Sequence, residues 1–523
     1  MRKLLKIACL KPSLSYFLVA FLIIQAFLSN AYAFDLTINT ENPGTVVNSN
    51  LFGFGAPEFR FCDIGNESFR RVVVALNSKT MRFPHGYFGN FYHWKEKGYG
   101  FKEDELDMIG GNAHKAITKY FSVYREGEVK ENFVDKLIEY DRLSTNKVLL
   151  IANILTGTEQ EFLDLIKYLK QNKVQIAGVE LGNELYSEAY RKLIPNVNAY
   201  IEKAERFAKA IRAKYPDLKL AVVAAPGNFE RKLGFAQSRY FNEWNNTIAK
   251  KDFYDAYVIH SYKEIAECEK AGSIDEQFEC AARKADESIN SDLPRAVKYY
   301  HALFGAKRKI WLTEWNVKES AYFGNTVFHA FYASEFLLKL IELDAQSNTI
   351  EYANYFCLCA KWLGYAMVNP KLQDEEVLDS GADYKRRTQY YPFLFMKGLF
   401  SDNVIMLESK VLSETGKVAE RATMYAFVNT KEEYLYIYIL NKMDKSQSVN
   451  LIINGKGFEF GANVADYQYV RASSVYAGMG VTGLGKEYRR PATIGAEQVK
   501  INSIIIHPYS IGYVKVKIKN LCL

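Results

Sequence analysis

Two short runs of the sequence each place a glutamate at the end of an apolar stretch, Gly178–Glu184 and Trp311–Val317. Two carboxyl groups roughly 5 to 5.5 Å apart can cleave a glycosidic bond with retention of configuration. One of them protonates the leaving oxygen while the other attacks the anomeric carbon. Glu184 is therefore the candidate acid/base, and Glu314 is the candidate nucleophile.

The stretch from residue 51 to 395 alternates strand-like apolar runs with helical patterns, which is typical of parallel strands joined by crossover helices. Eight such units predict an α/β fold, a closed (β/α)8 TIM barrel. The runs are Leu51–Ala56, Thr80–Pro84, Val148–Ile154, Ile176–Glu184, Leu218–Pro226, Tyr254–Tyr262, Lys309–Asn316 and Ile350–Trp362.

In a barrel of this kind the chemistry lies at the carboxyl ends of the strands. Glu184 closes the fourth run and Glu314 lies near the end of the seventh, so both should face the same mouth. A single glutamate at a strand end is explained equally well by a structural ion pair. Two of them in corresponding places favour a catalytic pair.

Other polar and aromatic residues end neighbouring runs. Arg82 on the second run can hold Glu314 in its charged form, and Tyr262 on the sixth can donate a hydrogen bond to it. His260 shares strand parity with Tyr262 and should point the same way, although a satisfied core histidine is an equal alternative. Trp362, at the end of the eighth run, is a candidate stacking floor for a sugar, with core packing as its rival.

The sequence pattern changes after residue 395. Short β-rich runs such as Tyr434–Leu440 and Ile504–Ile506 follow, separated by turn residues. Residues 396–523 are therefore predicted to form an all-β sandwich domain, which residues 34–50 should join as an N-terminal strand. Gly478–Gly483 fits the G-x-G-x-x-G dinucleotide pattern, but neither a helix nor a βαβ unit surrounds it. We interpret it as a sandwich loop.

Residues 1–33 have a basic start, an apolar run at Leu14–Leu28 and an A-x-A-like site at Ser29–Ala33. This is the pattern of a secretory signal peptide cleaved after Ala33. We expect a secreted or periplasmic protein that is not held in a membrane after cleavage. An uncleaved anchor is the alternative, which the short apolar run disfavours.

The net charge and the cysteines indicate which binding partners, disulfides and metals to expect. The formal net charge is +7, of which four charges lie in the leader, so no nucleic acid or other polyanionic partner is indicated. Cys268 and Cys280 flank a polar loop and are the predicted disulfide. Cys357 and Cys359, two residues apart on a strand-like run, are predicted to be buried thiols. No histidine or cysteine cluster has ligand spacing, so no metal or other cofactor is predicted.

The motifs resemble those of the retaining (β/α)8 glycoside hydrolases of clan A. Within that clan the chain is most similar to the α-L-arabinofuranosidases of glycoside hydrolase family 51, and more distantly to the heparanase-like enzymes. The likeness is carried by Met81–Gly86, Glu180–Glu184, Thr313–Asn316 and Pro508–Ile511. It implies Glu184 as acid/base, Glu314 as nucleophile, and Asn183 as the donor to the sugar 2-hydroxyl.

The sequence departs from the arabinofuranosidase motifs at two places. His85 stands where that family has a glycine, and Thr313 stands where it has an aspartate. A bulky imidazole beside the sugar pocket changes which ring fits, so His85 joins the candidate substrate-binding residues.

The sequence therefore predicts a secreted retaining glycoside hydrolase that acts on an oligo- or polysaccharide, arabinofuranosidase-like in its motifs. A clan A β-glycosidase or glucuronidase with another sugar specificity is one alternative. A non-catalytic carbohydrate-binding protein on the same barrel is another. An envelope structural protein is disfavoured, because the chain shows no repeats, low-complexity linkers or anchoring tail.

Overall fold

The computed structural model describes residues 32–519 except 99, 101, 109–130, 145, 228–233, 319, 362–363, 371–383, 414–420, 455–458, 462, 480–481 and 502–503. The predicted leader lies almost entirely outside these ranges. Among the helices described, none is both long enough and apolar enough to cross a membrane.

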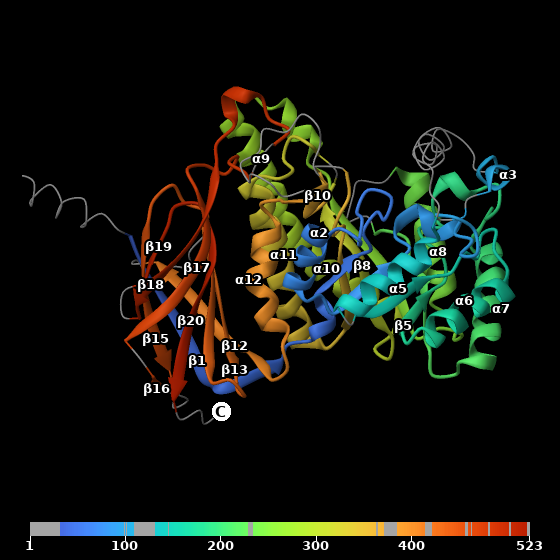
Figure 1. Ribbon diagram of the computed structural model, residues 1–523, viewed down its shortest axis with the longest axis horizontal. Coiled ribbons are helices and arrows are strands. Elements are labelled where there is room, and N and C mark those ends of the chain that lie inside the picture. The colour runs from blue at the N-terminus through green and yellow to red at the C-terminus, as the bar shows by residue number, and fades with distance from the viewer. Residues whose placement is uncertain are drawn as a thin grey trace, which may run out of the picture.

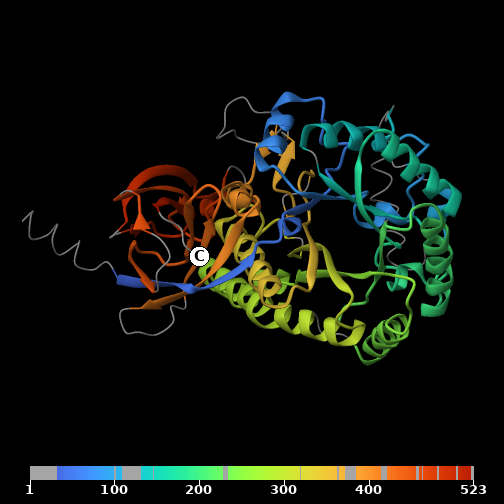
Figure 2. The ribbon, with the colours of Figure 1, turned by 90° about the horizontal axis from the view of Figure 1, so that it is seen from below.

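Eight parallel strands close into a barrel, which confirms the predicted fold class. Each strand pairs with the next in chain order, and the first pairs with the eighth through Gly53↔Asn354 and Phe54↔Tyr355. Figure 2 shows the helices arranged around this barrel. The strands are β2 (Gly53–Gly55), β3 (Thr80–Phe83), β4 (Lys147–Ile151), β5 (Gln175–Glu180), β6 (Lys219–Val223), β7 (Ala256–Lys263), β8 (Lys309–Val317) and β9 (Ile350–Tyr355).

Amphipathic helices cover the strands because each presents one apolar stripe to the sheet. In α6, the side chain of Thr158 caps the first turn by accepting from the Glu161 amide at 3.2 Å, and Phe162, Leu165 and Leu169 are buried. The main covering helices are α2 (Glu67–Leu76), α5 (Phe133–Ser144), α6 (Glu159–Gln171), α7 (Val197–Lys214), α8 (Phe235–Ile248), α9 (Ile274–Glu287), α10 (Leu293–Phe304) and α11 (Val327–Ser347).

Four predicted strands extend three or more residues too far. The third was expected to reach Ile154 and the fifth Pro226, but they end at Ile151 and Val223. The fourth was expected to run to Glu184 but ends at Glu180, because Gly182 with φ +92° turns the chain there. The eighth was expected to reach Trp362 but ends at Tyr355, and Trp362 itself lies outside the described residues. The apolar character of the fourth and eighth runs continues past the strand ends, because the segments that follow are buried too.

A ten-stranded sheet forms a second body beside the barrel (Figure 1). β1 (Tyr32–Val46) joins this sheet between β12 and β15, antiparallel to the first and parallel to the second. The sheet has its own core, which includes Leu36, Ile437 and Val514. Its other strands are β12 (Val404–Ser413), β13 (Ala422–Asn429), β14 (Tyr434–Asn441), β15 (Gln447–Asn454), β16 (Glu459–Phe460), β17 (Val464–Ala472), β18 (Ala492–Lys500), β19 (Ile504–Ile506) and β20 (Ser510–Lys519).

The β-domain packs on the barrel through α11 and α12 (Tyr390–Met396), which lie between the two bodies in Figure 1. Its β17–β18 loop also reaches the segment that follows β8. The amide of Val327 donates to the Ala477 carbonyl at 2.7 Å, and Gly478 forms a bridge with Thr326. The glycine pattern at Gly478–Gly483 therefore belongs to a loop that contacts the barrel, with no nucleotide-binding βαβ unit around it.

Two disulfides are present in the described part of the chain. Cys268 is joined to Cys280 with their Cα atoms 5.6 Å apart. Cys62 is joined to Cys359 across 297 residues, so the prediction of a buried thiol at Cys359 is wrong. The pairing of β2 with β9 brings these two cysteines together, and sequence spacing contains no sign of it. Cys357 is a buried free thiol.

The two disulfides should differ in their effect on stability. Removing Cys268–Cys280 by replacing both cysteines with alanine should lower the free energy of unfolding by roughly 2 to 3 kcal/mol, and removing Cys62–Cys359 by about 4 to 5 kcal/mol, because the closed loop is longer. Urea unfolding of the two double variants measures the difference. Equal losses, or free thiols at all four positions in exported wild-type protein, would contradict this expectation.

A buried histidine, His93, connects the long segment that follows β3 to helices α3 (Glu103–Leu106) and α6. Its Nε2 lies 2.7 Å from Glu105 Oε2 in α3, and its Nδ1 lies 3.0 Å from Glu161 Oε1 in the first turn of α6. Burial lowers the pKa of His93, but the hydrogen bonds to these carboxylates outweigh burial and raise it to about 9. His93 is therefore a cation at neutral pH that joins three segments.

His93 should make the free energy of unfolding decrease as the pH becomes alkaline. Because the pKa of His93 is raised in the folded protein, its contribution is complete below about pH 6.5 and is lost as the pH rises through 9. The loss is at most about 3 kcal/mol. Melting temperatures from pH 6 to 10 should fall more steeply for the wild type than for His93→Gln, which cannot titrate. Parallel curves would rule out this role.

Candidate active site

The two candidate glutamates reach the mouth of the barrel by different routes. Glu314 lies within β8, in register with His260 of β7 where that pairing shifts by a bulge. Glu184 lies beyond the end of β5, in a turn where its own φ is +46° and that of Gly182 is +92°. Few residues other than glycine adopt a positive φ without strain, so the surrounding contacts must hold Glu184 in this conformation.

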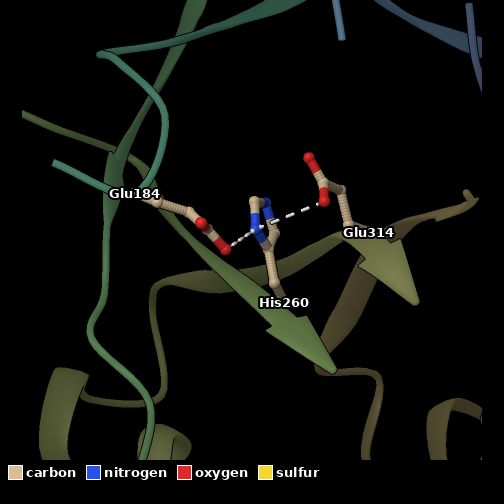
Figure 3. A group of neighbouring side chains, drawn as sticks. All are labelled: Glu184, His260 and Glu314. Atoms are coloured by element: carbon tan, nitrogen blue, oxygen red, sulfur yellow. Dashed lines mark hydrogen bonds and ion pairs between the residues drawn. The ribbon is translucent and has the colours of Figure 1, made fainter. Parts of the chain in front are cut away.

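His260 lies between the two carboxylates, as Figure 3 shows. Its Nδ1 is 2.9 Å from Glu184 Oε1 and 3.8 Å from Glu314 Oε2. A carboxylate oxygen of Glu184, a carboxylate oxygen of Glu314 and a ring nitrogen of His260 all lie within 4.8 Å of one another. The structure therefore brings together two glutamates that the sequence separates widely, with an imidazole between them.

The carboxyl group of Glu314 accepts hydrogen bonds from two donors. Arg82 Nη1 donates to its Oε1 at 2.6 Å, and the Tyr262 hydroxyl donates to its Oε2 at 2.6 Å. Burial and the Glu314 carboxylate raise the pKa of Tyr262 well above its ordinary value, so the phenol keeps its proton. Only 8% of the Glu314 side chain is exposed, against 24% for Glu184.

Arg82 is fully buried and has three partners. Besides Glu314, it donates to Glu180 through Nε at 2.9 Å and Nη2 at 2.8 Å, and to Asn183 Oδ1 at 2.7 Å. Burial lowers the pKa of the guanidinium, but the charges of Glu180 and Glu314 outweigh burial and raise it. Arg82 is therefore permanently charged, and Glu180 is its buried counter-ion.

The charge of His260 is set by the same neighbours. Burial lowers the pKa of His260, but the carboxylates of Glu314 and Glu184 outweigh burial and raise it above the ordinary value. A protonated His260 can donate to Glu184, and its charge reduces the repulsion between the two carboxylates.

His85 follows β3 and is buried. Its ring packs edge-on against Phe88 at 5.3 Å and Phe356 at 5.4 Å. Burial and the charge of Arg82 lower the pKa of His85 to about 3, so the imidazole is neutral. The next residue, Gly86, has a φ of +55°, which favours glycine, and a Cβ there would lie 3.9 Å from Glu314 Oε1, an ordinary van der Waals contact.

The same three side chains have the geometry of a metal site, but their partners argue against one. Glu184, His260 and Glu314 each offer one ligand atom. Both oxygens of Glu314 already accept hydrogen bonds, one from a buried guanidinium. A second positive charge next to Arg82 is unfavourable, so the arrangement suits a pair of reacting carboxyl groups better than a divalent cation.

Sequence reasoning missed two residues of the site, Glu180 and Asn90. Glu180 is an acid within a strand whose later residues are all buried, and that pattern is the signal that could have identified it. Asn90 contacts the backbone of Asn183 from a loop far away in the sequence, and no local signal marks it. The aromatic residues around it, Phe88, Phe91 and Tyr92, are buried in the main core of the barrel.

The sequence matches no family model and no curated protein. Solved structures do share the fold. The GH51 arabinofuranosidase from Xanthomonas axonopodis pv. citri superposes with a TM-score of 0.63 at 14% identity, covering 93% of this chain and all of that one. The α-L-arabinofuranosidase from Thermotoga maritima gives a TM-score of 0.63 at 15% identity, covering 92% of this chain and 99% of that one.

A third similar structure is the family 44 xyloglucanase from Paenibacillus polymyxa, with a TM-score of 0.55 at 11% identity, covering 93% of this chain and all of that one. The chain has the fold of these glycoside hydrolases. The match extends over the barrel and the β-domain together, so the two bodies form one recurring architecture.

The buried ion pairs predict a specific pattern of stability. Arg82→Met should lower the free energy of unfolding by roughly 3 to 5 kcal/mol, because it leaves Glu180 buried without its counter-ion. Adding Glu180→Leu removes that unpaired charge and should recover most of the loss. Urea unfolding of the single and double variants tests this. A double variant as unstable as Arg82→Met would show that the unpaired Glu180 is not the cause.

Proposed function

We propose that this chain is an exported retaining glycoside hydrolase that cleaves an oligo- or polysaccharide by double displacement. The observation that carries the proposal is the short distance between Glu184 and Glu314, whose nearest ligand oxygens lie within 4.8 Å. Retaining enzymes keep their carboxyl groups about 5 to 5.5 Å apart, whereas inverting enzymes need roughly 6.5 to 9.5 Å to admit a water molecule.

The environments of the two glutamates assign their roles. Glu314, fixed by Arg82 and Tyr262, is the carboxylate that attacks the anomeric carbon and forms a covalent glycosyl-enzyme. Glu184 is the more exposed group and gives its proton to the leaving oxygen. Two carboxyl groups in such different surroundings divide into a nucleophile and an acid.

In the second step, Glu184 is a carboxylate and accepts a proton from the water that attacks the glycosyl-enzyme. His260 can then donate to Glu184 through Nδ1 and hold it in place. Because Asn183 Oδ1 accepts from Arg82, its Nδ2 is the group left to donate to a sugar hydroxyl.

The sugar is proposed from likeness alone. Several similar structures are named arabinofuranosidases, which supports an α-L-arabinofuranoside as the first substrate to test. Hydrolysis of aryl arabinofuranosides, glucosides, xylosides and glucuronides by the full chain would identify the glycone. Sugar binding without cleavage would favour the carbohydrate-binding alternative.

Substitution of the two glutamates should give opposite stereochemical results with azide. Glu314→Ala should lose nearly all activity, and azide should restore cleavage of an activated aryl glycoside with inverted configuration, because the anion fills the space of the nucleophile. Glu184→Ala should lose about 10² to 10⁴-fold on poor leaving groups and much less on activated ones. Azide should then give a product of retained configuration.

The matched control is Glu188→Ala, an exposed glutamate in the same loop, which should keep wild-type kinetics. Product configuration by NMR and kcat/KM for leaving groups of graded pKa are the measurements. Equal, modest losses in both variants without an azide effect would remove the assignment of Glu184 and Glu314.

A further inference from the structure

We propose that Asn90 is a positioning residue that fixes the peptide carrying the acid/base glutamate; this inference rests on the proposed function. Asn90 ends η2 (Gly86–Asn90), in the segment after β3, and is fully buried. Its Oδ1 accepts from the Asn183 amide at 2.8 Å, and its Nδ2 donates to the Asn183 carbonyl at 2.7 Å. One side chain thus satisfies both backbone groups of the residue preceding Glu184.

The backbone around this contact is unusual and must be held by its surroundings. Gly182 and Glu184, on either side of Asn183, both have a positive φ. A glutamate in that region is strained, and such conformations persist only where neighbouring contacts determine them. The paired hydrogen bonds from Asn90 are contacts of that kind, because they fix the position and the direction of the Asn183 backbone.

Asn183 is also held from its other side. Arg82 donates to its Oδ1 at 2.7 Å, so the side chain is tied to the buried ion-pair network while Asn90 holds the backbone. With both fixed, the peptide that leads into Glu184 has a defined position and direction. General acid catalysis needs this group within hydrogen-bond reach of the leaving oxygen, and small displacements are costly.

The residues on either side of Asn90 are closely packed. A Cβ added at the preceding residue, Gly89, would lie 2.5 Å from Ile151 Cγ2, so η2 packs directly on the end of β4. The next residue, Phe91, is buried and contacts the Tyr190 ring, with centroids 6.3 Å apart. Packing on β4 therefore fixes the position from which Asn90 makes its two hydrogen bonds to Asn183.

The test compares leaving groups in Asn90→Ala. If Asn90 positions the acid, the variant should lose at least about 10-fold more kcat/KM on a phenyl glycoside, whose departure needs protonation, than on the dinitrophenyl glycoside of the same sugar, whose departure does not. A purely structural defect would lower both in proportion, because it reduces the fraction of folded enzyme.

The chain offers a matched control in Asn245 of α8. Asn245 Oδ1 accepts from the Ala225 amide at 2.8 Å and its Nδ2 donates to the Ala225 carbonyl at 2.9 Å, which is the same double contact on the segment after β6. Asn245→Ala should lower the melting temperature about as much as Asn90→Ala. Its relative rates on the two glycosides should equal those of the wild type.

A second variant covers the case in which Asn90→Ala does not fold. Asn90→Asp keeps the shape and the acceptor for the Asn183 amide, but it can donate to the carbonyl only when protonated. Its deficit on the phenyl glycoside should therefore shrink as the pH falls, relative to wild type at each pH. A constant ratio across pH would count against the proposal.

The outcomes separate this inference from the proposed function. If Glu184→Ala discriminates between the two glycosides and Asn90→Ala does not, Asn90 has no positioning role and the glycosidase assignment stands. If Glu184→Ala itself shows no discrimination, the acid assignment fails and the inference about Asn90 fails with it.

Discussion

The buried charge of Arg82 is the interaction on which the rest of the site depends. An isolated guanidinium in a protein interior is strongly unfavourable, so its partners must stay in place. Those partners come from β5, the turn after it, and β8, through Glu180, Asn183 and Glu314. Because one rigid, planar group joins three segments, Glu314 cannot move away without leaving positive charge unmatched.

The contact with Arg82 holds Glu314, and the described contacts of Glu184 are different. The two carboxyl groups therefore have unlike surroundings. Among the contacts described, the link of Glu184 to this network passes through His260. Two anions within 4.8 Å repel one another, and a protonated His260 between them reduces that repulsion. The two carboxyl groups therefore have different partners, a guanidinium and a phenol at Glu314 and an imidazole at Glu184.

The barrel could be predicted because its signals are local. Each strand is a short apolar run and most helices have a periodic stripe, so all eight strands were located, although four of them end three or more residues earlier than expected. What could not be predicted depends on contacts across the barrel. The Cys62–Cys359 disulfide, the Glu180 counter-ion and the Asn90 contact each join segments that are distant in sequence, and hydrophobic periodicity contains no information about such pairs.

The segment from Glu180 to Glu184 explains how a short motif can set a distance across the whole barrel. Its first residue pairs with Arg82 inside the barrel, Gly182 turns the chain, and Asn183 returns to the same guanidinium. The segment is thus attached twice to the group that also binds Glu314. The spacing of the two glutamates therefore follows from the size of one guanidinium and a four-residue turn. A shift of β5 relative to β8 would break these buried hydrogen bonds before it could separate the carboxyl groups.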